Sequence, residues 1–447
     1  MMPTRLLVLV ATGALVLPRV AAGQVDSQAP VTFTKDIAPI LQRSCQNCHR
    51  VGGGAPMSFI SYDDVRPWAR AIKQKTASRE MPPWFIDKTV GIQRFKDDPS
   101  LSDEQIAKIA KWVDTGAPGG NPADMPPPRQ FAAGNEWSIG TPDLIVSSPV
   151  AAVRALAPDW FGPVGSTATG LTEDRYIKAV EVKEIRVAMG SRPTTGALNL
   201  FSVHHASLAS RTQGDPEDSS TQSGFGMTYE LGQNALIYPN DVGALLKAGS
   251  EIDFSSLHLH AIGTEVKVRL DVAFKFHPKG YRPEYLLRNR THIGGSYDLD
   301  IPAGDNNVMR DAFYIMPQAG KILTFEPHLH SSGKRMCLEV MHPDGFREIL
   351  SCANYNHNWV KNYAYEDDVQ PLLPKGTLVH LMAWYDNSPN NPRVVEPRNW
   401  KGWGNRSIDD MFVMLPRIIF LTEDQFAKEV AAREAKRLSG LNRTNNP

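Results

Sequence analysis

The chain has no net charge, because 48 lysines and arginines balance 48 aspartates and glutamates in 447 residues. Nothing in this balance calls for nucleic acid as a partner. Beyond residue 17, the sequence lacks any run long and apolar enough to span a bilayer. It also offers no Ser-His-Asp set and no pair of carboxylates at a spacing that indicates hydrolysis. What remains is a globular chain with 42% hydrophobic residues, long enough for two or three cores.

The one marked apolar run, at the N-terminus, has the layout of an export signal. Arg5 precedes an apolar run over residues 6–17, and small residues follow at 21–23. This order predicts a signal peptide over residues 1–23, cleaved next to Gly23; an uncleaved N-terminal anchor is the alternative. We expect a mature chain without a stable membrane span, periplasmic or secreted, in an oxidising compartment.

Cysteine is scarce, with four residues in the chain, and two of them stand in one motif. Cys45-Gln46-Asn47-Cys48-His49 is C-x-x-C-H, the attachment pattern of haem c. In such a site Cys45 and Cys48 form thioethers to the porphyrin, and His49 is the proximal iron ligand. A redox disulfide or half of a zinc site can also begin with C-x-x-C, but the adjacent histidine and the export signal favour covalent haem.

The other two cysteines, Cys337 and Cys352, flank a turn signal at residues 342–345 in a strand-like segment. They can face each other across two antiparallel strands, and a bulge at Gly345 would move the register by one residue. The spacing predicts a disulfide bond.

The first hundred or so mature residues have helical periodicity and resemble a class I cytochrome c domain, which we place at residues 31–118. A capping box of Ser102 and Gln105 opens the last of three predicted helices. In the family, the methionine of a Met-Pro-Pro loop is the distal haem ligand, which the resemblance places at Met81; a thioether favours reduced iron. Met57 is the alternative, and we expect it to pack in the core. The predicted inward positions are Ile37, Leu41 and Cys45 in the first helix, Tyr62, Val65, Trp68 and Ile72 in the second, and Ile106, Ile109, Trp112 and Val113 in the third.

A linker rich in proline and glycine follows at residues 119–139, with three prolines at 126–128 as a semi-rigid spacer. From residue 140, short β-branched and aromatic runs alternate with turn residues, which is typical of antiparallel β-sandwiches. The stretch is too long for one sandwich, so we predict two in tandem, at 140–293 and 294–422. A cap at Thr422, with Gln425 three residues later, opens a last helix that we expect to run to about Leu438, and this helix and the tail span residues 423–447. The predicted strands lie at 143–147, 176–182, 266–276, 321–325, 336–341, 377–384 and 411–421.

Histidine carries the chemistry of this β region. Twelve histidines occur in the chain, and three tight groups stand here: His204-His205, His258-Leu259-His260 and His328-Leu329-His330. Side chains at i and i+2 of a strand share a face, so each H-x-H can offer two imidazoles to one ion. Imidazole suits zinc, copper, iron and nickel, so the groups predict a metal centre. The remaining β-region histidines are read as structural or surface residues: His277, His292, His342, His357 and His380.

Residues 140–422 resemble the copper type II, ascorbate-dependent monooxygenases, the family of the peptidylglycine and dopamine β-hydroxylating enzymes, and this resemblance implies jelly-roll-like sandwiches. The segments that carry it are Val203-His204-His205-Ala206, the run at 245–250 leading into Leu257-His258-Leu259-His260, Pro327-His328-Leu329-His330 with Gly333-Lys334, Leu373-Pro374-Lys375-Gly376-Thr377, the stretch at 385–392, and Trp403-Gly404 before Asp409-Asp410-Met411.

The resemblance implies two copper ions. The family's electron-transfer copper falls on His204, His205 and one histidine of the 258/260 pair; spacing to Gly263 favours His258, with His260 as the alternative. The family's catalytic copper falls on His328, His330 and Met411. A thioether favours Cu(I), whereas imidazoles tolerate both oxidation states. The competing reading is that Met411 and Met414 are core methionines.

The expected function is that of an exported haem c and copper oxidoreductase. We expect an O2-dependent monooxygenase that hydroxylates a C–H bond of an unidentified small molecule or peptide, with electrons from an external donor relayed by the cytochrome. Two alternatives stay open: a non-catalytic electron-transfer or copper-binding protein, and a substrate-binding pair of sandwiches with zinc or no metal.

Overall fold

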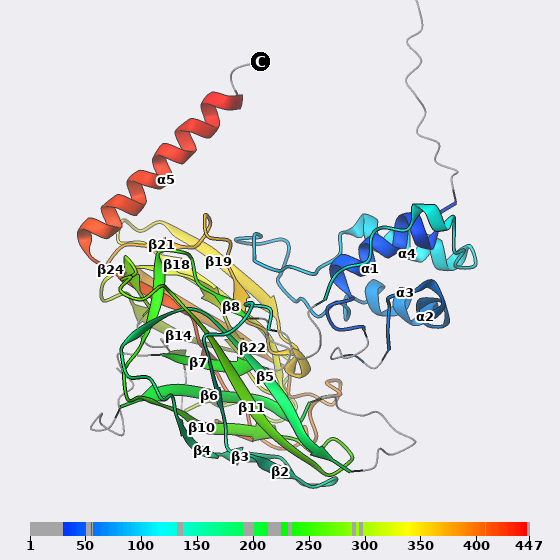
Figure 1. The fold of residues 1–447 in the computed structure, drawn as a ribbon, viewed down its shortest axis with the longest axis horizontal. Helices are drawn as coiled ribbons and strands as arrows, with labels where there is room; N and C mark the ends of the chain where they lie inside the picture. Colours follow the sequence, from blue (N-terminus) through cyan, green and yellow to red (C-terminus); the bar gives the residue numbers. More distant parts are fainter. Residues whose placement is uncertain are drawn as a thin grey trace, which may run out of the picture.

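The computed structural model describes residues 30–50, 55, 57–131, 137–190, 201–212, 225–230, 235–287, 292–294, 298–406 and 408–444. The predicted signal peptide at 1–23 lies outside these residues. Figure 1 shows a helical region from the first part of the chain beside a larger body of sheets, with a C-terminal helix projecting from the sheets. Among the described residues, no helix combines the length and the apolar character that crossing a membrane requires.

Short helices packed around Ile37, Leu41, Ile109 and Trp112 form the N-terminal region. The predicted capping box is confirmed, since Ser102 and Gln105 each accept a hydrogen bond from the other's backbone N–H. Trp68, expected to face inward, is 41% exposed, because the second helix is interrupted at Arg66–Trp68. The helical elements are η1 (Phe33–Ile37), α1 (Ala38–Ser44), α2 (Tyr62–Val65), η2 (Arg66–Trp68), α3 (Ala69–Ala77), α4 (Asp103–Asp114) and η3 (Pro122–Asp124).

The first half of the β region forms two sheets around one core. One sheet has the order β1-β11-β5-β9-β12, with β2 on β11 and β8 on β5, and the other has the order β3-β10-β6-β7, with β4 on β10. All pairs are antiparallel except β12 with β9. The strands are β1 (Leu144–Ser147), β2 (Ala151–Val153), β3 (Trp160–Gly162), β4 (Gly165–Ala168), β5 (Arg175–Met189), β6 (Val203–Arg211), β7 (Gly226–Glu230), β8 (Leu236–Ile237), β9 (Val242–Leu246), β10 (Glu251–Leu259), β11 (Val266–Phe276) and β12 (Tyr285–Leu286).

The second half forms smaller antiparallel sheets around a second core. Their orders are β14-β22-β18-β19, β13-β23-β17, β21-β15-β24 and β16-β20. The elements are β13 (Ile293–Gly294), β14 (Val308–Ile315), β15 (Ala319–Ile322), β16 (Thr324–Phe325), β17 (Pro327–His328), β18 (Gly333–Met341), β19 (Arg347–Asn354), η4 (His357–Trp359), β20 (Tyr363–Ala364), β21 (Leu372–Leu373), β22 (Leu378–Tyr385), β23 (Val413–Met414), β24 (Ile418–Leu421) and α5 (Glu423–Thr444).

The predicted fold class is confirmed at the level of a small helical part followed by antiparallel β-structure. The two cores do not divide cleanly along the chain. Ala319, Leu323, Ile419 and Leu421 of the second half pack into the core of the first. The two halves are therefore joined by shared apolar contacts rather than only by the connection near residue 294.

The disulfide prediction is confirmed. Cys337 and Cys352 lie directly opposite each other on β18 and β19, with their Cα atoms 4.1 Å apart, and form a disulfide. Gly345 in the connecting turn has a φ of 87°, which glycine adopts without the steric cost of a Cβ. The disulfide links the two strands of this hairpin, β18 and β19.

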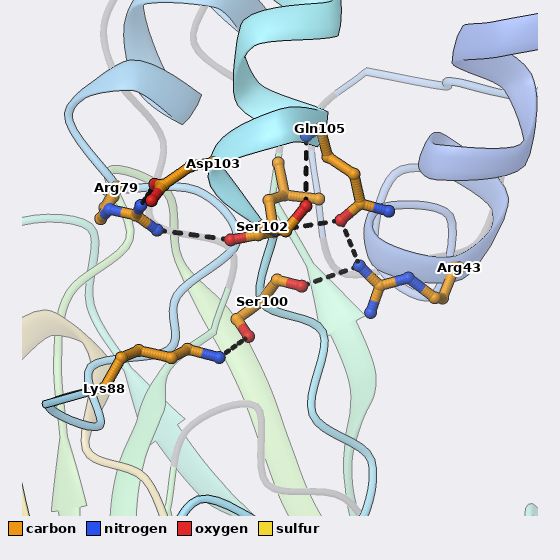
Figure 2. A pocket seen from close by; sticks show the side chains of 8 residues that line it. Arg43, Arg79, Lys88, Ser100, Ser102, Asp103 and Gln105 are labelled. Atoms are coloured by element: carbon orange, nitrogen blue, oxygen red, sulfur yellow. Dashed lines mark hydrogen bonds and ion pairs between the residues drawn. The ribbon is translucent and has the colours of Figure 1, made fainter. Parts of the chain in front are cut away.

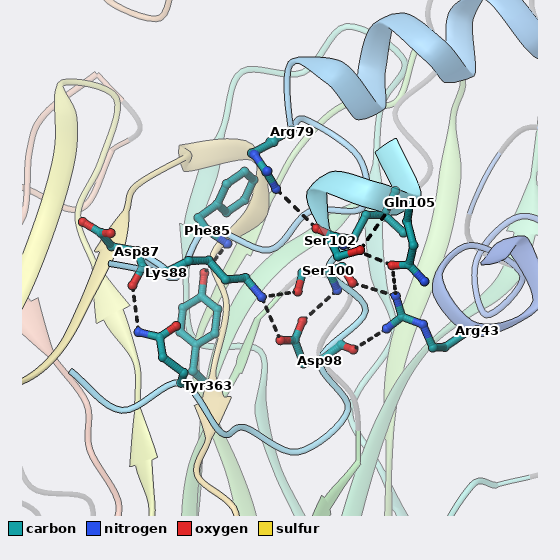
Figure 3. A network of polar contacts seen from close by, with 12 residues as sticks. Arg43, Arg79, Phe85, Asp87, Lys88, Asp98, Ser100, Ser102, Gln105 and Tyr363 are labelled. Atoms are coloured by element: carbon teal, nitrogen blue, oxygen red, sulfur yellow. Dashed lines mark hydrogen bonds and ion pairs between the residues drawn. The ribbon is translucent and has the colours of Figure 1, made fainter. Parts of the chain in front are cut away.

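Residues between α3 and α4 fasten the helical region to the second core. Ile86 and Phe95 are buried there and form bridges to Ala353 and Tyr365. The Phe85 N–H donates to the Tyr363 hydroxyl at 3.3 Å, a contact seen in Figure 3. The domain boundary that we predicted at residue 118 is therefore crossed by packing, because these apolar side chains lie in the β core.

Candidate metal centre

Two neighbouring strands bring the first two histidine groups together. β6 pairs with β10, and His205 lies directly opposite His258. The register then shifts, since Leu259 pairs with Val203, so His204 is the extra residue of a β-bulge. In a regular strand, His204 and His205 would face opposite sides of the sheet. With the bulge, their ring centroids lie 5.5 Å apart, so adjacent residues can line one centre.

The third group comes from the second half of the β region. β17 ends at His328, and the ring of His205 lies 5.3 Å from that of His328. His330 follows, with its ring 5.4 Å from His328. All six predicted imidazoles thus lie in one place, which we call the histidine cluster: His204, His205, His258, His260, His328 and His330.

Ligand atoms within the histidine cluster form two sets of three. Those of His204, His258 and His260 all lie within 4.8 Å of one another, and so do those of His205, His328 and His330. The resemblance had instead implied His205 as a partner of His204. Nδ1 of His258 is 3.1 Å from Nε2 of His205, so the two sets adjoin. The structure places both His258 and His260 in the first set.

Carboxylate side chains contact several rings of the histidine cluster. Oε1 of Glu230, on β7, lies 3.3 Å from Nδ1 of His328. Asp159 approaches His258 at 3.6 Å and His260 at 3.4 Å. A carboxylate that accepts a hydrogen bond from one ring nitrogen fixes the tautomer and leaves the other nitrogen for a metal. The sequence had not singled out these acids, because each lies far along the chain from the histidine that it contacts.

Asp410 positions the loop that carries His330. Its buried carboxylate accepts hydrogen bonds from the backbone N–H groups of His330 at 3.0 Å and Ser332 at 3.1 Å, and from the Ser332 hydroxyl. Burial raises the pKa of Asp410. Lys401 lies in the same buried region and donates to Ser331 Oγ at 2.8 Å. We regard Asp410 as a positioning residue, since it holds His330 through the backbone.

Burial favours the neutral form of four rings in the histidine cluster, those of His204, His205, His258 and His330. His258 and His330 are 0% exposed, and His204, His205 and His328 are at most 8% exposed. Desolvation lowers the pKa of His204 to about 3 and that of His258 to about 4, and it lowers the pKa values of His205 and His330 well below the usual range. Neutral imidazole is the form that binds metal.

Unpartnered ring nitrogens show that the cluster fits a metal ion. Nδ1 of His204, Nε2 of His260 and both ring nitrogens of His330 are buried without a hydrogen-bond partner. A buried polar atom left without a partner costs about 1–3 kcal/mol, so such atoms are rare in folded proteins. A metal bound to these lone pairs would supply the missing partner.

The same burial predicts how the metal-free protein responds to acid. Unfolded histidines take up protons below about pH 6.5, whereas burial lowers the pKa of His204 to about 3 and that of His258 to about 4. Stability contributed by the neutral rings is therefore present above pH 6.5 and is lost as pH falls toward 4. Each buried histidine contributes up to about 1.4 kcal/mol per pH unit to this slope.

Denaturant unfolding of the metal-free protein at pH 7.0, 6.0 and 5.0 would measure the slope. His330→Asn should reduce it by one histidine's share, because burial lowers the pKa of His330 well below its usual range. A free energy of unfolding that is constant from pH 7.0 to pH 5.0 would contradict the lowered pKa values of the buried rings.

Met411 and Met414 have different surroundings. Met414 is fully buried in the second core, which agrees with its reading as a core methionine. On β23, Val413 pairs with His328, so continuing this register would place Met411 opposite His330. Met411 is half-buried, and its carbonyl accepts a hydrogen bond from the Tyr385 hydroxyl at 2.8 Å. The position of its backbone suits the predicted ligand role, which stays a prediction.

His357 was read from the sequence as a structural or surface residue, and the structure places its ring beside the histidine cluster. It lies on η4 with its ring 5.1 Å from that of His204 and 5.5 Å from that of His330. It stands alone in the sequence, with no second histidine two residues away, so periodicity gave no signal. The other readings agree with the structure: His292 is exposed, His277 faces the Val242 carbonyl, and His342 and His380 face surface carboxylates.

The C-x-x-C-H motif lies just after α1. Cys45 is half-buried against the helical core and Cys48 is exposed. His49 stacks on Phe59, centroid to centroid at 4.2 Å, and burial lowers its pKa. Met57 packs against the helical core, as expected, and Met81, half-buried, follows α3. These residues suit covalent haem, with two thiols and a neutral imidazole on one short segment.

An open hollow on the helical region, with a volume of about 530 Å³, is a separate feature (Figure 2). Its cations are paired: Arg43 donates to the Ser100 carbonyl and to Gln105, Lys88 to Ser100, and Arg79 to Asp103. None of its lining residues belongs to the histidine cluster or to the C-x-x-C-H motif. We assign it no part in the chemistry.

Comparisons with known proteins leave the family open. No protein-family model matches the chain, and no curated protein matches it. A solved structure of the infectious bursal disease virus Gx strain is similar over 64% of this chain and 74% of its own chain, with 10% sequence identity and a TM-score of 0.19. A similarity this low carries no argument about fold or function.

Proposed function

We propose that this protein is an exported haem c and copper oxidoreductase that hydroxylates a C–H bond with O2, with electrons relayed by its haem-bearing region. The observation that carries the proposal is the histidine cluster, with its two sets of three imidazoles and its unpartnered ring nitrogens. Bound copper would supply the one-electron steps and the activation of O2. That the metal is copper and that the substrate is a C–H donor are both parts of the proposal.

The roles of the chain's own residues follow from their contacts. Glu230 lies within hydrogen-bond distance of Nδ1 of His328, and Asp159 lies beside His258 and His260, so the two carboxylates orient these rings. Asp410 fixes the loop of His330. The surrounding apolar cores exclude water from most of the cluster, and His260, the most exposed member with 23% of its side chain accessible, marks the side open to solvent.

One observation favours a second candidate, a copper-binding or electron-transfer protein without catalysis. Catalytic metal sites keep an open coordination position, whereas structural sites are closed. His205, His258, His328 and His330 are almost fully buried. Metal analysis, followed by O2 uptake of the reduced protein with and without a panel of C–H donors, separates the candidates. Donor-dependent uptake supports the oxygenase; copper without such uptake supports the second candidate.

The electron relay gives a prediction for the first set of histidines. The haem is reduced anaerobically, and its reoxidation on adding O2 is followed by absorbance. His204→Ala should keep the haem spectrum and reoxidise at least tenfold more slowly, since the set loses an imidazole. His258→Ala and His260→Ala in the same assay would show which ring matters more.

The matched control for the relay is His342→Ala, since His342 faces Glu348 on the surface hairpin. It should reoxidise at the parent rate. The haem does not feed the metal centre if its reoxidation rate is the same in all three cluster variants while product still forms with ascorbate as the reductant.

A further inference from the structure

His357 lies between the two sets of the histidine cluster. Its ring is 5.1 Å from His204 of the first set and 5.5 Å from His330 of the second. Within the first set, His204 lies 4.8 Å from His260 and 5.4 Å from His258, centroid to centroid. His357 is thus as near to His204 as the members of that set are to each other.

Both ring nitrogens of His357 are buried and have no hydrogen-bond partner. In water, a neutral imidazole would donate from one nitrogen and accept at the other, so burying both without partners costs about 1–3 kcal/mol for each. Structural histidines of this chain avoid the cost. His277, for example, places Nε2 2.9 Å from the Val242 carbonyl. A ligand for the ring would remove the cost at His357.

The backbone of His357 also acts on the cluster. Its carbonyl oxygen lies 3.2 Å from Nε2 of His204. A carbonyl only accepts, so His204 carries its proton on Nε2 and directs the lone pair of Nδ1, which is buried without a partner, into the cluster. His357 therefore orients His204 through its backbone carbonyl and also places its own imidazole beside the histidine cluster.

We propose that His357 is a further metal ligand, the fourth imidazole of the set formed by His204, His258 and His260. Four nitrogen ligands fill the coordination of a copper ion, whereas three imidazoles at His205, His328 and His330 leave a position open. The first set would then be the closed, electron-transferring site and the second the site that is open to O2. The choice of copper rests on the function proposed above; the ligand assignment does not.

The position of His357 in the chain suits a site that receives electrons. Six residues after it, Tyr363 contacts the helical region, with its hydroxyl at the Phe85 N–H and its ring 4.8 Å from that of Trp84. Trp84 follows Met81 by three residues. One short segment, residues 357–363, thus reaches from the metal centre to the loop that holds the predicted haem ligand.

The test compares His357→Gln and His357→Ala with His380→Gln as the matched control, since His380 is part-buried but bound to surface carboxylates. Cu(II) is titrated into the metal-free proteins against a chelator, and each site is observed by electron paramagnetic resonance. His357→Gln should weaken one of two sites by roughly ten- to a hundredfold and change its spectrum, with the other site and the control unchanged. Metal-free stability should change little, because glutamine replaces two unpartnered ring nitrogens with two amide atoms of similar polarity.

The opposite pattern would overturn the assignment. If His357→Gln binds Cu(II) with the parent's affinity and spectrum, and only the alanine variant loses stability, His357 fills space and holds no metal. If the parent binds Zn(II) but no copper, the proposed function fails, and the same titration with Zn(II) still decides whether His357 is a ligand.

Discussion

Replacing His330 with alanine is expected to abolish O2-dependent turnover, with a loss of roughly a hundredfold or more. His330 is fully buried, both of its ring nitrogens lack partners, and it belongs to the set of His205, His328 and His330, to which we assign the O2-binding site. Removing one of three imidazoles costs a metal site more than losing an outer partner, which itself costs about ten- to a hundredfold. His328→Ala should have the same effect. Copper per chain and O2 uptake of the reduced protein measure it.

Asp410→Asn provides an informative comparison for His330→Ala. Asp410 accepts two backbone hydrogen bonds that shape the loop of His330, without offering a ring of its own. An intermediate loss is expected, with copper still bound but more weakly. Full turnover in both histidine variants, or zinc alone in protein matured with copper available, would refute the copper assignment of this set.

The double variant Cys45→Ala with Cys48→Ala is expected to remove all covalent haem. Two thioethers hold a c-type haem, so the parent, made with a haem-attachment system, should retain peroxidase stain on a denaturing gel. The double variant should lose the stain completely. The helical core should survive, because Cys45 only packs against it and its buried residues come mainly from η1, α1, α2, α3 and α4.

Cys337 and Cys352 give a control with the same residue type. They form the disulfide between β18 and β19, so their replacement should lower thermal stability and leave the haem stain intact. A parent protein that is exported but colourless would remove haem from the proposal, and the metal centre would then need a diffusible reductant.

Local signals in the sequence were sufficient for much of this architecture. The capping boxes at Ser102 and Thr422 were found as predicted, because each depends on two residues three positions apart. The strand predicted at 266–276 is β11, and the hairpin around Gly345 places the two cysteines in register. The strand predicted at 411–421 is interrupted, since residues 415–417 separate β23 from β24. The last helix ends at Thr444 rather than near Leu438.

Residue types and short spacings determined which chemistry this chain can offer. A C-x-x-C-H motif and two H-x-H pairs are each complete within five residues, and strand alternation predicted that the two rings of each pair share a face. In the structure, His260 and His330 lie just past the ends of β10 and β17. Only the tertiary structure decided which rings lie together in each set of the histidine cluster. The bulge at His204 turned that ring toward the cluster, packing of the two β cores brought His205 to His328, and η4 delivered His357. The packing of Ile86 and Phe95 into the second core was likewise decided by the tertiary structure. Such contacts depend on strand register and on apolar packing between residues far apart in the chain, and neither is contained in a local pattern.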